Sequence, residues 1–363
     1  MKSSRNRSYR IVAIPGEGIG PEVVQAALIM LQKVAALEGF TLQIDYGLLG
    51  APALAQSGSY FPPATAQLCD GADGIVFGAV SQGGLLELRK HFDLFCNLRP
   101  IRMVDSLVAK SSLRPEKVRG LDLLIVRELV SGIYFGSSGR ATDEQGDYGY
   151  HTMRYGDREI QRIARSALQQ AQQRRGLLTV AHKENALPHL PWTRLVQAEA
   201  TDFPGVVVEP MLVDNLAMQM VINPLRFDVI LAGNLFGDIL SDIGGGLVGS
   251  IGLLGSASLN ADGFGLYEAI HGTAPDIAGR GIANPLGTLG ACVLMLQQWG
   301  EEQAAQRIVS AQARVLAQGY RTADLSPQAN EILVNTQTLV DLLLAELTTE
   351  QYSELGVLHE SRK

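Results

Sequence analysis

The chain has 363 residues, of which 46% are hydrophobic and 18% charged, a balance typical of a globular protein with sizeable cores. Lysine and arginine number 30 against 37 aspartate and glutamate, and the resulting charge of −7 gives no electrostatic basis for binding nucleic acid or a membrane surface. The three cysteines are widely spaced and the apolar stretches are interrupted, so we expect no disulfide framework, no membrane span and a cytoplasmic location.

The first predicted element is a strand at residues 10–15, followed by a glycine-rich turn. Pro21 suits the first turn of a helix, and Gly39 suits its C-terminal end. The glycines between them follow the spacing G-x-G-x-G and not the G-x-G-x-x-G of dinucleotide-binding loops. We therefore interpret this segment as a structural turn.

Strand-like runs and helical patterns then alternate along the chain, which predicts an α/β fold with substantial parallel pairing. The clearest helix carries an apolar stripe at i, i+3 and i+4 spacing, formed by Ile160, Ile163, Ala164, Ala167, Leu168 and Ala171. Further strands are predicted at 41–46, 74–79, 95–103, 121–127, 177–182, 206–213 and 228–232, and helices at 286–299, 301–318 and 336–347.

Residues 136–150 interrupt this alternation. They are rich in Gly, Ser, Asp and Tyr and lie between a strand and the strongest helix. The segment is either an ordered arm or a long surface loop, and loops of this length in compact domains often have a function.

Two aspartates follow the apolar run at 228–232. If residues 234–242 open a helix, Asp238 and Asp242 are separated by one turn and project from the same face. Paired carboxylates suit Mg²⁺ or Mn²⁺, although a solvated acidic face is the commoner meaning of this spacing. Asp214 follows another strand and either caps a helix or supplies a third carboxylate.

Three arginines occur in motifs near predicted strand ends. Arg89 lies in Leu-Leu-Glu-Leu-Arg-Lys, Arg99 in Asn-Leu-Arg-Pro, and Arg127 ends an apolar strand. A single arginine is usually exposed or paired with a structural acid. Together, the three guanidinium groups fit a substrate with two or more carboxylates.

Two further side chains could transfer protons. Tyr134, in Gly-Ile-Tyr-Phe-Gly, is a candidate proton donor, and Lys183, directly after an apolar strand, is a candidate base. The alternatives are a half-buried strand tyrosine and a surface lysine whose stem covers apolar neighbours.

The segment 268–279, Glu-Ala-Ile-His-Gly-Thr-Ala-Pro-Asp-Ile-Ala-Gly, is expected to be a loop of small residues. Such a loop allows its backbone to approach a ligand closely. Asp276 could face a ribose diol, which favours NAD over NADP because a carboxylate repels the 2′-phosphate.

These motifs, in this order, resemble the β-decarboxylating dehydrogenases of the isocitrate/isopropylmalate family. The resemblance covers residues 10–347 and is greatest to the 3-isopropylmalate dehydrogenases, because of the motifs at 85–90, 95–100 and 127–136. It implies a two-lobed isocitrate/isopropylmalate dehydrogenase-like fold that is not a Rossmann fold. Residues 1–94 and 250–363 would form a large cofactor-binding lobe, and residues 95–249 a small lobe with the metal site and an arm that makes a homodimer with shared active sites.

The resemblance implies NAD- and metal-dependent oxidative decarboxylation of a 3-substituted malate. The expected residues are Tyr134 and Lys183 for proton transfer; Leu85, Leu86, Arg89, Arg99 and Arg127 for substrate; Asp214, Asp238 and Asp242 for Mg²⁺ or Mn²⁺; and Glu268, His271, Gly272, Ala274, Asp276 and Asn284 for NAD. The metal would take Asp238 and Asp242 from one subunit and Asp214 from the other, and Lys183 would also come from the partner subunit. A catalytically silent regulatory paralogue is the alternative from another class, and a tartrate- or isocitrate-type dehydrogenase the alternative within the family.

Three departures from the family pattern bear on the substrate's side chain. Glu17 stands where the family usually has Asp, the loop at 78–84 is short, and residues 182–186 read His-Lys-Glu-Asn-Ala in place of Asp-Lys-Ala-Asn-Val. Leu85 and Leu86 predict an apolar wall, and residues 80–88 contain no Lys or Arg for a third carboxylate. We therefore expect isopropyl or a larger apolar group, such as benzyl, as the 3-substituent.

Overall fold

A computed structural model describes residues 7–348, and its centre is one ten-stranded sheet. Its strand order is β2-β1-β3-β12-β11-β4-β5-β10-β8-β9. The strands are β1 (Ser8–Gly16), β2 (Thr41–Tyr46), β3 (Gly74–Ala79), β4 (Cys96–Arg102), β5 (Asp122–Glu128), β8 (Leu177–His182), β9 (Val207–Leu212), β10 (Val229–Ala232), β11 (Gly255–Leu259) and β12 (Gly265–Ala269).

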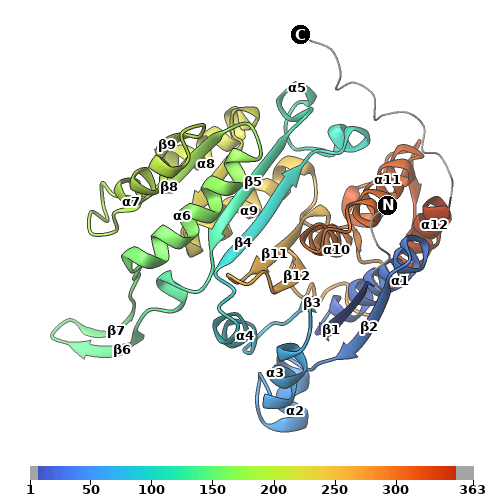
Figure 1. Ribbon diagram of the computed structural model, residues 1–363, viewed down its shortest axis with the longest axis horizontal. Helices are drawn as coiled ribbons and strands as arrows, with labels where there is room; N and C mark the ends of the chain where they lie inside the picture. Colours follow the sequence, from blue (N-terminus) through green and yellow to red (C-terminus); the bar gives the residue numbers. More distant parts are fainter. Residues whose placement is uncertain (1–6, 349–363) are drawn as a thin grey trace.

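The sheet has two parallel halves joined by an antiparallel centre. The neighbours β2, β1, β3 and β12 run parallel, as do β5, β10, β8 and β9. Between them, β11 and β4 are antiparallel to each other and to their outer neighbours. Figure 1 shows elements from both chain ends on one side and the middle of the chain on the other. The predicted α/β class is confirmed; the lobe boundaries stay a prediction, and residues 1–6 and 349–363 lie outside the described part.

Helices connect the strands. The longest, α1, ends at Gly39 in the left-handed conformation with φ 70°, as predicted. Every residue of the predicted stripe on α6 is buried, because this face packs on the core. The α-helices are α1 (Gly20–Glu38), α2 (Ala51–Ser57), α3 (Pro63–Asp70), α4 (Leu85–His91), α5 (Pro115–Val118), α6 (Asp157–Gln172), α7 (Trp192–Glu199), α8 (Val213–Ile222), α9 (Asn234–Val248), α10 (Leu286–Gln298), α11 (Glu302–Ala317) and α12 (Thr336–Thr348).

Two central strands differ from the prediction. Residues 255–259 and 265–269 form the antiparallel pair β11–β12, so Glu268 lies within a buried strand and does not begin a loop. Their Gly, Ser and Ala residues give no apolar alternation, and the sheet buries them through long-range pairing. The predicted strand at 206–213 is also one residue too long at each end, because α8 begins at Val213.

The segment at 136–150 is an ordered arm. Residues Ser138–Asp143 (β6) and Gly146–His151 (β7) form an antiparallel hairpin that extends away from the rest of the protein (Figure 1). Tyr148 and Tyr150 of β7 are exposed. Within residues 7–348, no helix is both long and apolar enough for a membrane crossing.

Two glycines bring α9 against the sheet. A Cβ at Gly244 would lie 2.2 Å from Ile101 Cδ1 on β4, and one at Gly237 would lie 2.7 Å from Arg127 Cγ on β5. Neither distance is possible without displacement, so the helix can approach the sheet this closely only where the side chain is absent. This packing carries Asp238, the next residue after Gly237, over the end of β5.

Replacing Gly244 therefore tests the helix–sheet contact. We expect Gly244→Ala to lower the free energy of unfolding by about 1–3 kcal/mol, because its methyl group overpacks the contact with Ile101. The matched control is Gly246→Ala in the same helix, where, apart from the adjacent residues and the helix's own backbone, no atom of the described residues lies within 4 Å of the added Cβ. That variant should gain about 0.5–1 kcal/mol from the better helix propensity of alanine. Urea unfolding measures both, and equal effects of the two substitutions would contradict the packing argument.

Candidate active site

A cleft of about 300 Å³ opens over the central strands. It brings together elements from both halves of the sheet, among them β3, α4, β4, β5, α9 and β12. Most of the predicted site residues line it: Leu85, Leu86, Arg89, Arg99, Arg127, Tyr134, Asp238, Glu268, His271 and Gly272.

Asp238 holds two of the predicted arginines at the floor of the cleft. Its Oδ1 accepts hydrogen bonds from Arg127 Nη1 at 2.5 Å and from Arg99 Nη1 at 3.2 Å. The Tyr134 hydroxyl donates to its Oδ2 at 3.2 Å. One carboxylate thus gathers a phenol and two guanidinium groups, whose side chains are only 3% and 6% exposed.

Two asparagines that the sequence reasoning missed orient these arginines. Asn97 Oδ1 accepts from Arg99 Nε at 2.7 Å, and Asn234 Oδ1 accepts from Arg127 Nη2 at 2.7 Å. Asn234 also donates to the backbone carbonyls at 129 and 131, so its own position is fixed. Residue spacing could have identified both asparagines. Asn97 is two residues before Arg99 and shares its strand face, and Asn234 lies one helical turn before Asp238.

The third arginine has a different partner. Arg89 Nη2 donates to Glu268 Oε1 at 2.6 Å, and both side chains are 8% exposed. The carboxylate of Glu268 thus balances the charge of Arg89, and its predicted contact with a cofactor stays a prediction. Arg89 Nε is buried without a hydrogen-bond partner among residues 7–348, so this guanidinium group retains a free donor.

The arginines strongly influence the ionisation of the cleft. Burial, followed by repulsion from Arg99, lowers the pKa of Arg127 to about 9. Burial raises the pKa of Asp238, but attraction to Arg127 and Arg99 outweighs it, and the net pKa is lowered. Burial and the neighbouring Asp238 raise the pKa of Tyr134, which keeps its hydroxyl protonated at neutral pH.

The two predicted metal ligands on α9 lie one turn apart, as expected. Burial and repulsion from Asp238 raise the pKa of Asp242, and this rise outweighs the opposing attraction of Arg99 and Arg127. Within residues 7–348 no three His, Cys, Asp or Glu side chains of one chain form a group that could hold a metal ion. Asp238 and Asp242 could supply two carboxylate ligands to a hard divalent cation, and its remaining oxygen ligands would have to come from outside this chain.

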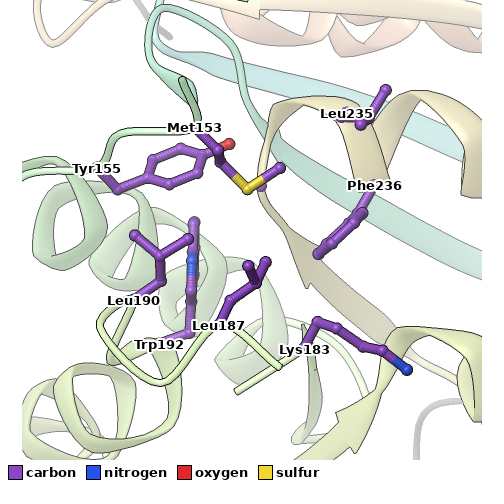
Figure 2. A pocket seen from close by; sticks show the side chains of 9 residues that line it. Met153, Tyr155, Lys183, Leu187, Leu190, Trp192, Leu235 and Phe236 are labelled. Carbon is purple, nitrogen blue, oxygen red and sulfur yellow. The ribbon is translucent and has the colours of Figure 1, made fainter. Parts of the chain in front are cut away.

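Lys183 and Asp214 form a pair of their own, away from the arginine cleft. Lys183 Nζ lies 2.9 Å from Asp214 Oδ1, an interaction that, with nearby backbone N–H groups, lowers the pKa of Asp214. The N-cap of α8 is Leu212, and Asp214 lies within the first turn. Lys183 borders a separate hollow of only about 10 Å³. Figure 2 shows its amine directed away from the rings of Tyr155 and Trp192.

The predicted cofactor residues fall into two groups. At the cleft, His271 Nε2 is buried without a hydrogen-bond partner in the described part of the chain, and nothing described lies within 4 Å of a Cβ built at Gly272. An orphaned ring nitrogen beside open backbone fits a bound ligand. Ala274 and exposed Asp276 continue this loop. Asn284 lies just before α10, where its side chain accepts from the backbone N–H of residue 286 and donates to Asp324.

Comparison with known proteins agrees with this geometry. The family model described as isocitrate/isopropylmalate dehydrogenase matches residues 10–343. A 3-isopropylmalate dehydrogenase from Methylococcus capsulatus is 44% identical over 357 residues, covering 94% of this chain and 99% of that protein. One from Aquifex aeolicus is 40% identical, covering 94% and 98%.

A solved structure has the same fold. The isocitrate dehydrogenase from Methylococcus capsulatus superposes with a TM-score of 0.84 at 31% identity, covering 94% of this chain and 100% of that one. The isocitrate/isopropylmalate dehydrogenase-like fold predicted from the motifs is thereby confirmed. With a family match over most of its length and a cleft built from that family's motifs, the chain belongs to the isocitrate/isopropylmalate dehydrogenase family and is a dehydrogenase.

Proposed function

We propose that this protein catalyses the NAD- and divalent-metal-dependent oxidative decarboxylation of a 3-substituted malate to the 2-oxo acid and CO₂. The observation that carries the proposal is the convergence of Arg89, Arg99 and Arg127 in one cleft. Three buried guanidinium groups need anionic partners, and the two carboxylates of a malate meet that need with bidentate geometry. In the free protein, Asp238 and Glu268 serve as these partners.

The charges of the cleft also favour joint binding of metal and substrate. Three arginines face Asp238, Asp242 and Glu268, so the local charges balance. A divalent cation alone, or a malate dianion alone, would leave two uncompensated charges in a partly buried site. Bound together, the cation and the dianion leave the net charge of the site unchanged. The carboxylate of Asp238 could then bind the cation, while Arg99 and Arg127 bind the carboxylates of the substrate.

The chain's own residues supply the proton transfers. Lys183 accepts the proton of the C2 hydroxyl, and Tyr134, held in its protonated form, donates a proton to C3 after CO₂ has left. Arg89, Arg99 and Arg127 hold the carboxylates and orient the C2 hydrogen. When bound, the divalent cation supplies Lewis-acid polarisation of the C2 oxygen. NAD, when bound, supplies the hydride acceptor.

The positions of Lys183 and Asp214 support the proposal that a homodimer shares its active sites. Neither borders the arginine cleft of its own chain, yet Asp214 lies in the first turn of α8, which packs beside α9. These two helices expose Met218, Val221, Ile222 and Ile239. Pairing them about a two-fold axis would bury this apolar surface and bring Lys183 and Asp214 to the partner's Asp242. The β6–β7 arm supports the same assembly, because an isolated hairpin is marginally stable.

Two further features bear on the choice of cofactor and on the cellular compartment. Exposed Asp276 disfavours the 2′-phosphate of NADP by charge repulsion, which makes NAD the proposed cofactor. The cysteines, Cys69, Cys96 and Cys292, are all free and buried, which suits a reducing compartment such as the cytoplasm.

We propose an apolar 3-substituent, 3-isopropylmalate among the substrates, with room for larger groups such as benzyl. Val80, Leu85, Leu86 and Ile270 line the cleft beside the arginines, and its lining within residues 7–348 offers no fourth arginine and no lysine. Ala186 is exposed one turn after Lys183 and would enter the partner's site with it. Its small side chain leaves space opposite the leucines.

Turnover tests the reaction and its metal. With NAD, Mg²⁺ and 3-isopropylmalate, we expect NADH to form, and EDTA to abolish this until Mg²⁺ or Mn²⁺ is restored. Asp242→Asn should lower kcat/KM by about 10²-fold or more, because it removes a metal carboxylate. Full activity in chelator would contradict the metal role.

Comparing the two cofactors tests the assignment of NAD. NADP should give the lower kcat/KM, and equal kcat/KM values for NAD and NADP would contradict the assignment.

Mixing two inactive variants tests the shared site. Lys183→Met and Asp242→Asn should each be inactive alone. If Lys183 serves the partner's site, a heterodimer regains one intact site. In that site the Lys183→Met chain supplies Asp238 and Asp242, and the Asp242→Asn chain supplies Lys183 and Asp214. Differently tagged chains should therefore recover activity on co-refolding. The control is Lys183→Met mixed with itself, and confirmed heterodimers without activity would argue against shared sites.

A substrate ratio tests the wide pocket. We expect 3-benzylmalate to reach a kcat/KM within about tenfold of that for 3-isopropylmalate, because the extra apolar contacts of the benzyl group offset the entropy lost when it is ordered in the pocket. Ala186→Val should shift the ratio toward isopropyl by about 1–3 kcal/mol, the value of a methylene or two. A preference of orders of magnitude for isopropyl, unchanged by Ala186→Val, would rule out the wide pocket.

A further inference from the structure

The short segment 79–84 forms one side of the cleft and leads directly into α4. Val80 lines the cleft, and Gly84 is the N-cap of the helix that carries Leu85, Leu86 and Arg89. Ser81, Gln82 and Gly83 between them are exposed and belong to no helix or strand. Something outside the segment must therefore hold it if the leucines are to form a fixed wall.

Glu17, in the turn after β1, contacts this segment from outside the cleft. Its Oε2 accepts hydrogen bonds from the Ser81 hydroxyl and, at 3.4 Å, from the Ser81 N–H. Its other oxygen, Oε1, accepts from the N–H of Ala51 at 2.9 Å. The Glu17 N–H donates to the carbonyl of Ala79 at 2.7 Å. One residue thus joins the β1–α1 turn, the start of α2 and the cleft segment.

The surroundings of Glu17 are built for this contact. A Cβ at Gly50 would lie 2.6 Å from Glu17 Oε1 and 2.6 Å from Val80 Cγ1, so only glycine leaves the space in which they meet. Partial burial raises the pKa of Glu17, but the hydrogen bonds from Ser81 and Ala51 outweigh it and lower the pKa, which keeps the carboxylate ionised at neutral pH.

The far end of the segment is held by packing. Gly83, with φ 62°, lies on the ring of Tyr60, where a Cβ would come within 2.4 Å of Cγ. The Tyr60 carbonyl accepts from the N–H of Gly50 at 3.0 Å. Ser81 is thus held by the turn after β1 and Gly83 by Tyr60 after α2, and both anchors are bonded to the neighbouring residues Gly50 and Ala51.

We propose that Glu17 is a positioning residue that latches residues 79–84 to the start of α2 and thereby fixes the Leu85–Leu86 wall of the cleft. The length of its side chain matters, because its two oxygens must reach Ser81 and Ala51 at once. An aspartate keeps the charge but is one methylene shorter, so it can hold one partner and not both. The effect on catalysis rests on the proposed function, whereas the latch itself does not.

Amide hydrogen exchange tests the latch without any substrate. In Glu17→Asp, peptides covering residues 79–86 should exchange about tenfold faster than in the wild type, because the loss of one anchor lets the segment open. Peptides from α10 should be unchanged. The matched control is Glu346→Asp, which shortens another acid that accepts from two side chains, Arg314 and Gln318, far from the cleft. Wild-type exchange over 79–86 in Glu17→Asp would overturn the proposal.

Ser81 provides a second pair of variants. Ser81→Ala removes the hydroxyl donor and should raise exchange over 79–86, whereas Ser81→Thr keeps it and should match the wild type. In the double variant Glu17→Asp/Ser81→Ala, the effects should be less than additive, because the bridge from Ser81 through Glu17 to Ala51 is open once either link is lost. Full additivity would mean that Glu17 and Ser81 act separately and would overturn the latch.

Steady-state kinetics then connect the latch to the site. Glu17→Asp should raise KM for 3-isopropylmalate about tenfold while kcat changes less than about twofold, because the wall contacts the substituent and not the reacting atoms. A fall in kcat with KM unchanged would overturn the positioning role. If the wild type turns over no 3-substituted malate, the proposed function fails, and the exchange measurements still decide whether Glu17 latches the segment.

Discussion

The structure depends on placing three arginines in one cleft without leaving their charges unbalanced. Arg99 and Arg127 are almost fully buried, and an uncompensated buried cation costs several kcal/mol. Asp238 and Glu268 provide the compensation, and Asn97 and Asn234 satisfy remaining donors. The free site is therefore an assembled set of charges whose internal partners can be exchanged for those of a ligand, which is how it can be both stable and ready to bind.

That exchange requires a rigid scaffold. Arg99 and Arg127 lie on β4 and β5, where neighbouring strands on both sides fix the backbone, and the glycines of α9 bring Asp238 directly over them. Arg89 lies on α4, and its ion pair with Glu268 ties it to β12 of the same sheet. The segments that contact the variable substituent and the cofactor are expected to be less rigid, and they lie in the turn at 79–84 and the loop after β12. Charge recognition thus rests on the sheet, and recognition of the substituent rests on loops, which tolerate changes in length.

Local patterns predicted the local features well. The stripe on α6 and the spacing of Asp238 and Asp242 depend on helical periodicity alone, and both have the expected form. The strands β11 and β12 were missed because their small residues show no strand pattern, and the pair is completed by β4 and β3, which are more than 150 residues away in the sequence. The pairing of Arg89 with Glu268 was missed for the same reason. No local pattern can reveal which arginine of a set will face which acid.

The order of strands in the sheet also constrains how the protein can be made. The strand β3 pairs on one side with β1 and on the other with β12, which ends at Ala269. During synthesis, β1, β2 and β3 emerge early, but the inner edge of β3 has no partner until nearly two hundred further residues have been added. An apolar strand edge left open for that interval is a site for mispairing. The nascent chain therefore has a long period of vulnerability in its first eighty residues, which ends only when β12 is in place.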